Sequence, residues 1–149
     1  MRVFLDTNIL LEYLCARTKA LVVRDLLDKI EDCGYEALLS SSSFCTIAYY
    51  VEMSLKQMGL HKPEKTKKTR ETLNALLGFV TIAETTHERT CIATNDASFT
   101  DFEDSMQYQC AIQNGCDYLI TFNVKDYKNA SQEQVKVVSP EDFLKMYKG

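Results

Sequence analysis

Oxygen-bearing side chains follow the ends of several predicted strands, and their types and spacing are suited to chemistry. They are Asp6 and Asn8 after residues 3–5, Ser40 to Ser43 after residues 37–39, Glu84 after residues 79–82, Asn123 and Asp126 after residues 118–121, and Asp101, Glu103 and Asp104 at the start of the predicted helix before the fourth strand. Hard oxygen ligands of this kind are the ones that Mg²⁺ and Mn²⁺ prefer. The set therefore predicts a divalent cation site.

A divalent ion at such a site would support phosphodiester chemistry. It polarises a phosphoryl oxygen, lowers the pKa of a bound water and stabilises the leaving oxygen of an in-line displacement. Asp and Asn are also ordinary helix N-caps. Each position taken alone therefore has a purely structural interpretation, and only the set as a whole favours a cation site.

Short apolar runs alternate with helical patterns along the chain. The runs predict strands at residues 3–5, 37–39, 79–82, 118–121 and 135–138. The helical patterns cover residues 9–14, 21–33, 44–58, 66–77, 86–95 and 102–114, and a last helix follows Ser139. Gly78 is expected to end the fourth of these helices, and residues 59–70 are expected to form the most mobile loop.

Five short apolar strands separated by helices predict a three-layer α/β/α fold with a central, mainly parallel five-stranded sheet. The 149 residues, 46% of them apolar, fit a single domain spanning 1–149. Open parallel sheets bind ligands beyond the carboxyl ends of their strands, where the strand order reverses. The oxygen-bearing residues therefore fall at the expected ligand-binding edge.

The charge is unevenly distributed along the chain. The net charge is -4, yet residues 61–70 hold five basic side chains against Glu64 and sum to +4. The five are Lys62, Lys65, Lys67, Lys68 and Arg70. Such a cluster is either a solvated surface or a contact for a polyanion, and RNA phosphates are the partner that we expect.

The amino terminus and the cysteines bear on localisation. Asp6 interrupts the first apolar run, so no secretory h-region is predicted, and no apolar run reaches the ~18 residues that a membrane helix needs. The six cysteines form no CxxC pair. We expect buried, reduced thiols, a cytoplasmic protein and no membrane contact.

Two other functional classes compete with a metal-dependent hydrolase. A phosphatase or receiver domain would use Asp6 as nucleophile or phosphoacceptor, but Asn8 cannot donate the proton that a second acid would supply. A dinucleotide-binding domain needs GxGxxG spacing, which none of the five glycines approaches.

Three segments resemble the motifs of PIN domains, most closely those of the VapC-type ribonucleases, the toxin components of bacterial toxin-antitoxin pairs. The segments are residues 3–10, residues 101–111 and residues 116–127, and the serine-rich turn and the closing residues 139–144 are similar as well. The resemblance runs almost from end to end of the chain.

The resemblance implies a Mg²⁺- or Mn²⁺-dependent endoribonuclease. Asp6 and Asp104 match family acids that bind metal, and Asn123 stands where many members have a further acid. The remaining family acid falls near Thr46 or Ile47, where this chain has none, and Glu52 is a poor substitute because it lies well round the helix.

Other residues could complete the site that the resemblance implies. Asp126 would supply a third carboxylate if its loop folds back, while Asn8, Thr121, Asp101 and Glu103 would support the site. On the helix, Asp101 and Asp104 should share a face, with Glu103 directed elsewhere. The reduced acidic set leaves a degenerate PIN domain, which binds RNA or a protein without cleaving, as the alternative. The resemblance also implies a cognate antitoxin protein and a homodimer.

Overall fold

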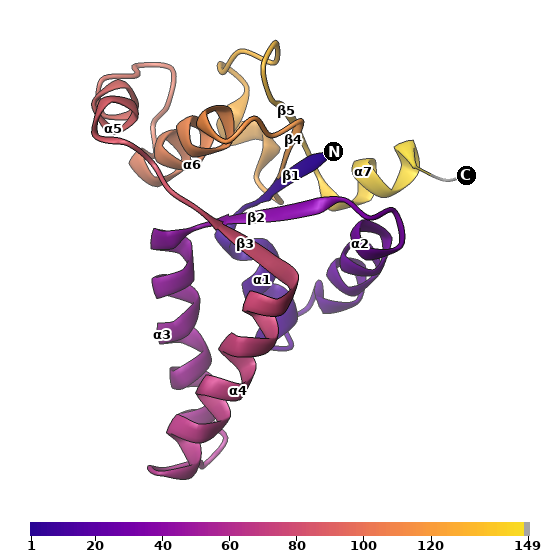
Figure 1. Ribbon diagram of the computed structural model, residues 1–149, viewed down its shortest axis with the longest axis vertical. Coiled ribbons are helices and arrows are strands. Elements are labelled where there is room, and N and C mark those ends of the chain that lie inside the picture. Colours follow the sequence, from indigo (N-terminus) through magenta and orange to yellow (C-terminus); the bar gives the residue numbers. More distant parts are fainter. Residues whose placement is uncertain (148–149) are drawn as a thin grey trace.

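A five-stranded parallel sheet forms the centre of the computed structural model, which describes residues 1–147 (Figure 1). The strands are β1 (Arg2–Leu5), β2 (Glu36–Ser40), β3 (Val80–Ala83), β4 (Tyr118–Ile120) and β5 (Lys136–Val138). Their order in the sheet is β3-β2-β1-β4-β5, and all four pairings are parallel. The chain builds outward from β1 to β3 and then crosses to the other side of β1. The strand order therefore reverses between β1 and β4.

Helices connect the strands and cover both faces of the sheet. They are α1 (Thr7–Leu14), α2 (Ala20–Asp32), α3 (Ser41–Gln57), α4 (Glu64–Phe79), α5 (His87–Thr94), α6 (Phe102–Gln113) and α7 (Pro140–Met146), with a 3₁₀ helix, η1, at Val124–Tyr127. In Figure 1, α5 and α6 lie on the opposite side of the sheet from α1, α3 and α4. The expected α/β fold of three layers with a parallel sheet is confirmed.

The central strands are buried on both faces, which explains their nearly uninterrupted apolar sequences. In β1, Val3 and Leu5 belong to the core beneath α1 to α4 and α7, whereas Phe4 belongs to the core beneath α6. Alternate side chains of a strand point to opposite faces, so one short run fills two cores.

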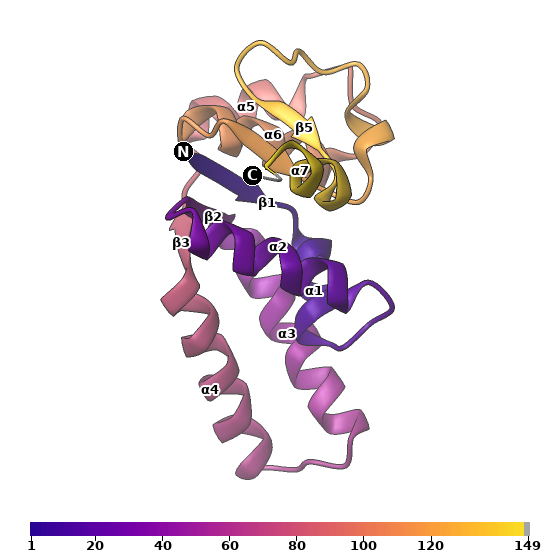
Figure 2. The same ribbon diagram turned by 90° about the vertical axis from the view of Figure 1, so that its right-hand side faces the viewer.

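Helices α3 and α4 form an arm that extends away from the sheet, and Figure 2 shows their connection at its far tip. The helix expected at residues 66–77 is observed as α4, which begins at Glu64. The expectations of a loop through residue 70 and of a helix end at Gly78 are wrong, because both positions lie within α4. Thr69 and Leu76 are buried along this helix, and Leu73 packs against the core. Tertiary packing of this kind outweighs the cost of about 1 kcal/mol for a glycine within a helix.

Several local predictions can be compared with the structure. Ser139 caps α7 as expected, since the backbone N–H of Asp142 donates to its Oγ at 3.1 Å. All six cysteines are free thiols, but Cys33, Cys45 and Cys91 are exposed, so the expectation of burial is wrong for these three. They lie at the end of α2 and on the outer faces of α3 and α5, where apolar periodicity does not separate a core cysteine from a surface one.

Within residues 1–147, no helix combines the length and the apolar character that a membrane crossing requires.

Candidate active site

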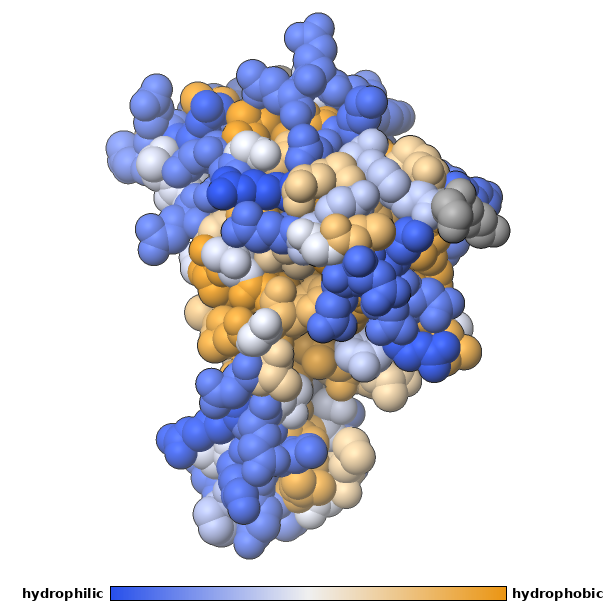
Figure 3. All heavy atoms as spheres, turned by 45° about the vertical axis from the view of Figure 1, so that its right-hand side comes forward, coloured by the Kyte–Doolittle hydropathy of each residue, from blue (hydrophilic) through white to orange (hydrophobic). Residues whose placement is uncertain are grey.

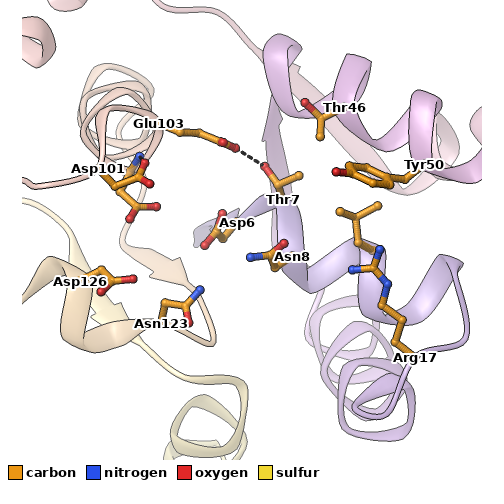
Figure 4. A pocket seen from close by; sticks show the side chains of 12 residues that line it. Asp6, Thr7, Asn8, Arg17, Thr46, Tyr50, Asp101, Glu103, Asn123 and Asp126 are labelled. Carbon is orange, nitrogen blue, oxygen red and sulfur yellow. Dashed lines mark hydrogen bonds between the residues drawn. The ribbon is translucent and has the colours of Figure 1, made fainter.

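A hollow of about 310 Å³ opens at the carboxyl edge of the sheet, at the point where strand order reverses between β1 and β4 (Figure 4). It is lined by Asp6, Thr7, Asn8, Leu11, Arg17, Thr46, Tyr50, Asp101, Glu103, Asp104, Asn123 and Asp126. Seven of the expected site residues are therefore brought together from three different segments of the chain, namely the end of β1 with the start of α1, the start of α6, and the segment after β4.

Asp6 is the buried centre of this hollow, with 3% of its surface exposed. It precedes α1 in the N-cap position, yet its side chain makes no capping hydrogen bond. Instead, Gln107 Nε2 donates to its Oδ1 at 2.8 Å and Thr121 Oγ1 donates to its Oδ2 at 2.7 Å. Thr121 Oγ1 in turn accepts from the backbone N–H of Asn123 at 3.0 Å. The structural interpretation of Asp6 as a helix cap therefore fails, because α6 and the end of β4 hold its carboxylate in place.

Asp104 lies in the first turn of α6 and carries an unusual pKa. Burial, followed by the negative charges of Asp101 and Asp6, raises the pKa of this carboxyl to about 7, and Asp126 adds to the effect. Tyr127 opposes the shift, because its hydroxyl donates to Asp104 Oδ1 at 3.2 Å. Four carboxylates are therefore close enough to repel one another, which is the condition that a bound cation would relieve.

Asp101 and Glu103 have structural partners as well as places in the hollow. Asp101 caps α6, since its Oδ1 accepts from the backbone N–H of Asp104 at 3.1 Å. Glu103 Oε1 accepts from Thr7 Oγ1 at 3.1 Å. The expectation that Glu103 points elsewhere is wrong, because the end of β1 faces the first turn of α6 and brings Thr7 within reach (Figure 4).

The serine cluster extends this hydrogen-bond network. Ser40 caps α3 and its Oγ donates to Ser43 Oγ at 2.8 Å, and Ser43 Oγ lies 2.6 Å from Thr7 Oγ1. Because Thr7 donates to Glu103, each hydroxyl in this series can donate a hydrogen bond to the next residue, from Ser40 through Ser43 and Thr7 to Glu103. This series of hydrogen bonds connects the starts of α1, α3 and α6 and fixes them around the hollow.

The remaining expected residues occupy the rim. Asn8, Asn123 and Asp126 all line the hollow, and η1 turns the chain so that Asp126 faces the same space as Asp6 (Figure 4). Thr46 lines the opposite wall, and the resemblance predicts a further family acid near this residue or Ile47. Glu84 lies beyond the edge strand β3 and does not line the hollow, so its expected place in the set is wrong.

The basic residues lie apart from the hollow. Lys62 precedes α4, and Lys65, Lys67, Lys68 and Arg70 are in its first two turns at the tip of the arm (Figure 2). Lys62, Lys67 and Arg70 line one shallow depression there, whereas Lys65 and Lys68 do not. The five cations therefore do not share a single face.

Sequence reasoning missed two residues that contact the carboxylates directly. Gln107 is 2% exposed and holds Asp6, while its Oε1 has no hydrogen-bond partner among the described residues. Tyr127 is 1% exposed and holds Asp104. A signal existed for the first, since Gln107 follows Asp104 by three residues and shares its helix face, and a polar side chain on a buried face needs a partner.

The donor set fits a hydrated divalent cation. Within residues 1–147, no three His, Cys, Asp or Glu side chains are already arranged closely enough to enclose an ion. Mg²⁺, however, keeps several waters and takes only one or two protein carboxylates together with substrate phosphate oxygens. Asp6 and Asp104, with the amide oxygen of Asn123, meet that requirement, and softer ligands are absent from the lining.

The sheet is parallel, and carboxylates gather where its strand order reverses. These features define an α/β protein with an acidic site at the carboxyl edge of its sheet. Residues 2–125 match the family described as PIN domain, and the chain belongs to that family. PIN domains are typically nucleases, and they are generally metal-dependent. The search of curated proteins found no match. The matched residues include every residue of the hollow except Asp126, and they end before β5 and α7.

Proposed function

We propose that this protein is a metal-dependent endoribonuclease and the cytoplasmic toxin component of a toxin-antitoxin pair. Asp6 and Asp104, with Asn123, would hold Mg²⁺ or Mn²⁺, and the substrate would be the phosphodiester backbone of RNA. The observation that carries the proposal is the pairing of a rigidly held, buried Asp6 with an Asp104 whose pKa is raised to about 7 by neighbouring carboxylates.

Each residue has a role in this proposal. Gln107 and Thr121 orient the Asp6 carboxylate, and Tyr127 stabilises the ionised form of Asp104. Asp6 and Asp104 would hold a divalent ion, which would supply Lewis-acid activation of the phosphoryl group and of water. Asp126 is an exposed carboxylate on the same hollow, where it can accept the proton of the attacking water. Glu103 and Asp101 keep α6 in position.

The test is cleavage of end-labelled RNA in Mn²⁺, Mg²⁺ or EDTA. We expect cleavage only with the divalent ions, and we expect Asp6→Asn and Asp104→Asn to abolish it. Asp28→Asn makes the same chemical change on the exposed surface of α2 and should retain activity. Activity that survives in Asp6→Asn or Asp104→Asn would overturn the proposal. RNA binding without cleavage by the wild type would favour the degenerate PIN domain instead.

The basic arm is the proposed outer RNA contact. Neutralising phosphates makes affinity for a single strand fall with salt, with a slope of about 0.7 per phosphate on logarithmic axes. The triple change of Lys65, Lys67 and Lys68 to Ala should weaken RNA binding and flatten this slope by about 2. An unchanged slope would remove the arm from the interface.

An antitoxin protein and a second copy of the chain are the proposed protein partners. An apolar hollow between α1, α2 and α4 supports a protein contact, and its lining includes Leu14, Leu27 and Phe79 beside Asp28 and Glu31. Figure 3 shows apolar side chains gathered in the middle of the molecule and hydrophilic ones over the tip of the arm. Light scattering of the purified chain, alone and with the antitoxin, would measure both associations.

A further inference from the structure

One half of the hollow is not acidic. Arg17 and Tyr50 line it together with Thr46, and Figure 4 shows them on the opposite side of Asp6 from Asp101. No carboxylate within residues 1–147 forms an ion pair with Arg17. Its guanidinium lies 5.8 Å from the centroid of the Tyr50 ring. This is near the outer limit of about 6 Å for a cation–π contact, so the side chain is held only weakly.

The backbone before Arg17 is strained. Ala16 has a φ of +50°, which is the left-handed conformation that side chains other than glycine rarely adopt. The turn is fixed by the N–H of Arg17, which donates to the carbonyl oxygen of Glu12 at 2.9 Å. Backbone strain of this kind concentrates at binding and catalytic sites, because the surrounding structure must maintain it. Here it aims Arg17 toward the hollow.

The same turn places a second cation beside a second aromatic ring. Lys19 Nζ lies 4.4 Å from the centroid of Phe122, which directly precedes Asn123. The short connection between α1 and α2 thus holds Arg17 near the ring of Tyr50 on α3 and Lys19 near the ring of Phe122, which follows β4. Arg17 lines the hollow itself, and Lys19 lies outside its lining beside the residue that precedes Asn123, so both positive charges favour the approach of a phosphate backbone to this side.

Tyr50 presents a stacking surface. The residue is 38% exposed, and Tyr49 supports its ring in an edge-to-face contact with centroids 5.3 Å apart. Thr46 and Tyr50 are four residues apart on α3, so both face the hollow. Unpaired bases stack on exposed aromatic rings, while bases within a duplex have no free face to offer.

We propose that Arg17 and Tyr50 form a nucleotide-binding subsite beside the acidic centre, in which Arg17 binds a backbone phosphate and Tyr50 stacks on an unpaired base. The subsite therefore selects an unpaired strand over a duplex. The inference rests on the proposed function, because the acidic half of the same hollow is where the strand would be cut. A guanidinium suits this role, since its planar N–H fork matches phosphate oxygens.

The test measures binding separately from cleavage. Fluorescence anisotropy with a labelled single-stranded RNA, and with the same RNA as a duplex, is carried out in the non-cleaving Asp104→Asn background, in EDTA, so that no bound ion contributes. Into this background are placed Arg17→Gln, Tyr50→Ala and Tyr50→Phe. The controls are Arg24→Gln, whose side chain pairs with Asp25 on α2, and Ile92→Ala, which is 43% exposed on α5 outside the hollow.

We expect Tyr50→Ala to weaken single-strand binding about tenfold, at the low end of what one stacked base contributes, and Tyr50→Phe to restore it. Arg17→Gln should also weaken binding about tenfold and flatten the salt slope by about 0.7. Duplex binding should not respond to Tyr50→Ala. In the cleaving protein, Tyr50→Ala should raise KM with little change in kcat.

The outcomes separate this inference from the proposed function. If the wild type does not cleave RNA but the Arg17 and Tyr50 effects on binding persist, the nuclease proposal fails and the subsite stands. If the wild type cleaves and both variants behave like Arg24→Gln and Ile92→Ala, the subsite is refuted and the nuclease stands. Failure of the Asp104→Asn protein to bind single-stranded RNA at all also refutes the subsite.

Discussion

The Asp104→Asn substitution should stabilise the metal-free protein at alkaline pH while it abolishes activity. Folding raises the pKa of this carboxyl from its ordinary value of 3.8 to about 7. The folded state therefore binds more protons than the unfolded state between these two values, so its stability falls as pH rises through that window and is constant above it. Asparagine cannot ionise, so the variant escapes this loss.

The magnitude follows from the shift and from the solvent around the group. At about 1.36 kcal/mol per pKa unit, the shift sets an upper limit of about 4 kcal/mol. Asp104 is only partly buried, and solvent screening reduces this to about 1–2 kcal/mol. The change in hydrogen bonding to Tyr127 adds a contribution that does not depend on pH, and it cancels when two pH values are compared.

Urea denaturation in EDTA at pH 4.5 and pH 8 measures the effect. The free energy of unfolding of Asp104→Asn minus that of the wild type should be about 1–2 kcal/mol more favourable at pH 8 than at pH 4.5. Asp28→Asn should stay within about 0.5 kcal/mol of the wild type at both pH values. A difference for Asp104→Asn that is equal at both pH values, or larger at pH 4.5, would refute the reasoning.

Addition of Mn²⁺ at pH 8 should make the wild type more stable than Asp104→Asn, which is the reverse of their order in EDTA. A ligand that binds only the folded state stabilises it by about 2.7 kcal/mol at one hundred times its Kd. The wild type has both carboxylates and should gain Tm on addition of Mn²⁺, whereas Asp104→Asn should gain little. Equal gains by the two proteins would place the ion elsewhere.

Three further predictions concern single contacts. Gln107→Leu removes a donor from the buried carboxylate of Asp6, so calorimetry should show Mn²⁺ affinity reduced about tenfold; unchanged affinity would show that Asp6 needs no such support. Tyr127→Phe removes the hydrogen bond that favours ionised Asp104, so the pKa of Asp104 should rise further. The acidic limb of the pH profile of the cleavage rate should then move to higher pH, and an unchanged profile would exclude Asp104 as the titrating group. Ala16→Gly relieves a left-handed conformation and should raise the free energy of unfolding by up to about 1 kcal/mol. A lower free energy of unfolding in the variant would show that Ala16 is not strained at this turn.

The elements of the fold were largely predictable because their signals are local. Each strand is a short apolar run that fills both cores, and residues such as Ser139 mark a helix start within three positions of sequence. The end of α4 was not predictable in this way, because Gly78 favours a helix end and yet lies within the helix. Its basic first turns carry no strong apolar pattern, whereas Leu76, near its end, is buried in the core that it shares with residues of α1, α2 and α3.

The sequence by itself determined that oxygen ligands follow β1 and β4, because parallel strands bring their carboxyl ends to one edge. Only the tertiary structure decided which of them meet. Asp6 is held by Gln107 from α6, a residue 101 positions away, and Glu103 faces Thr7 across 96 positions. Such contacts depend on how α6 packs against the sheet relative to β1. The pKa of Asp104 is likewise a property of burial and of neighbouring charges, which no sequence spacing specifies.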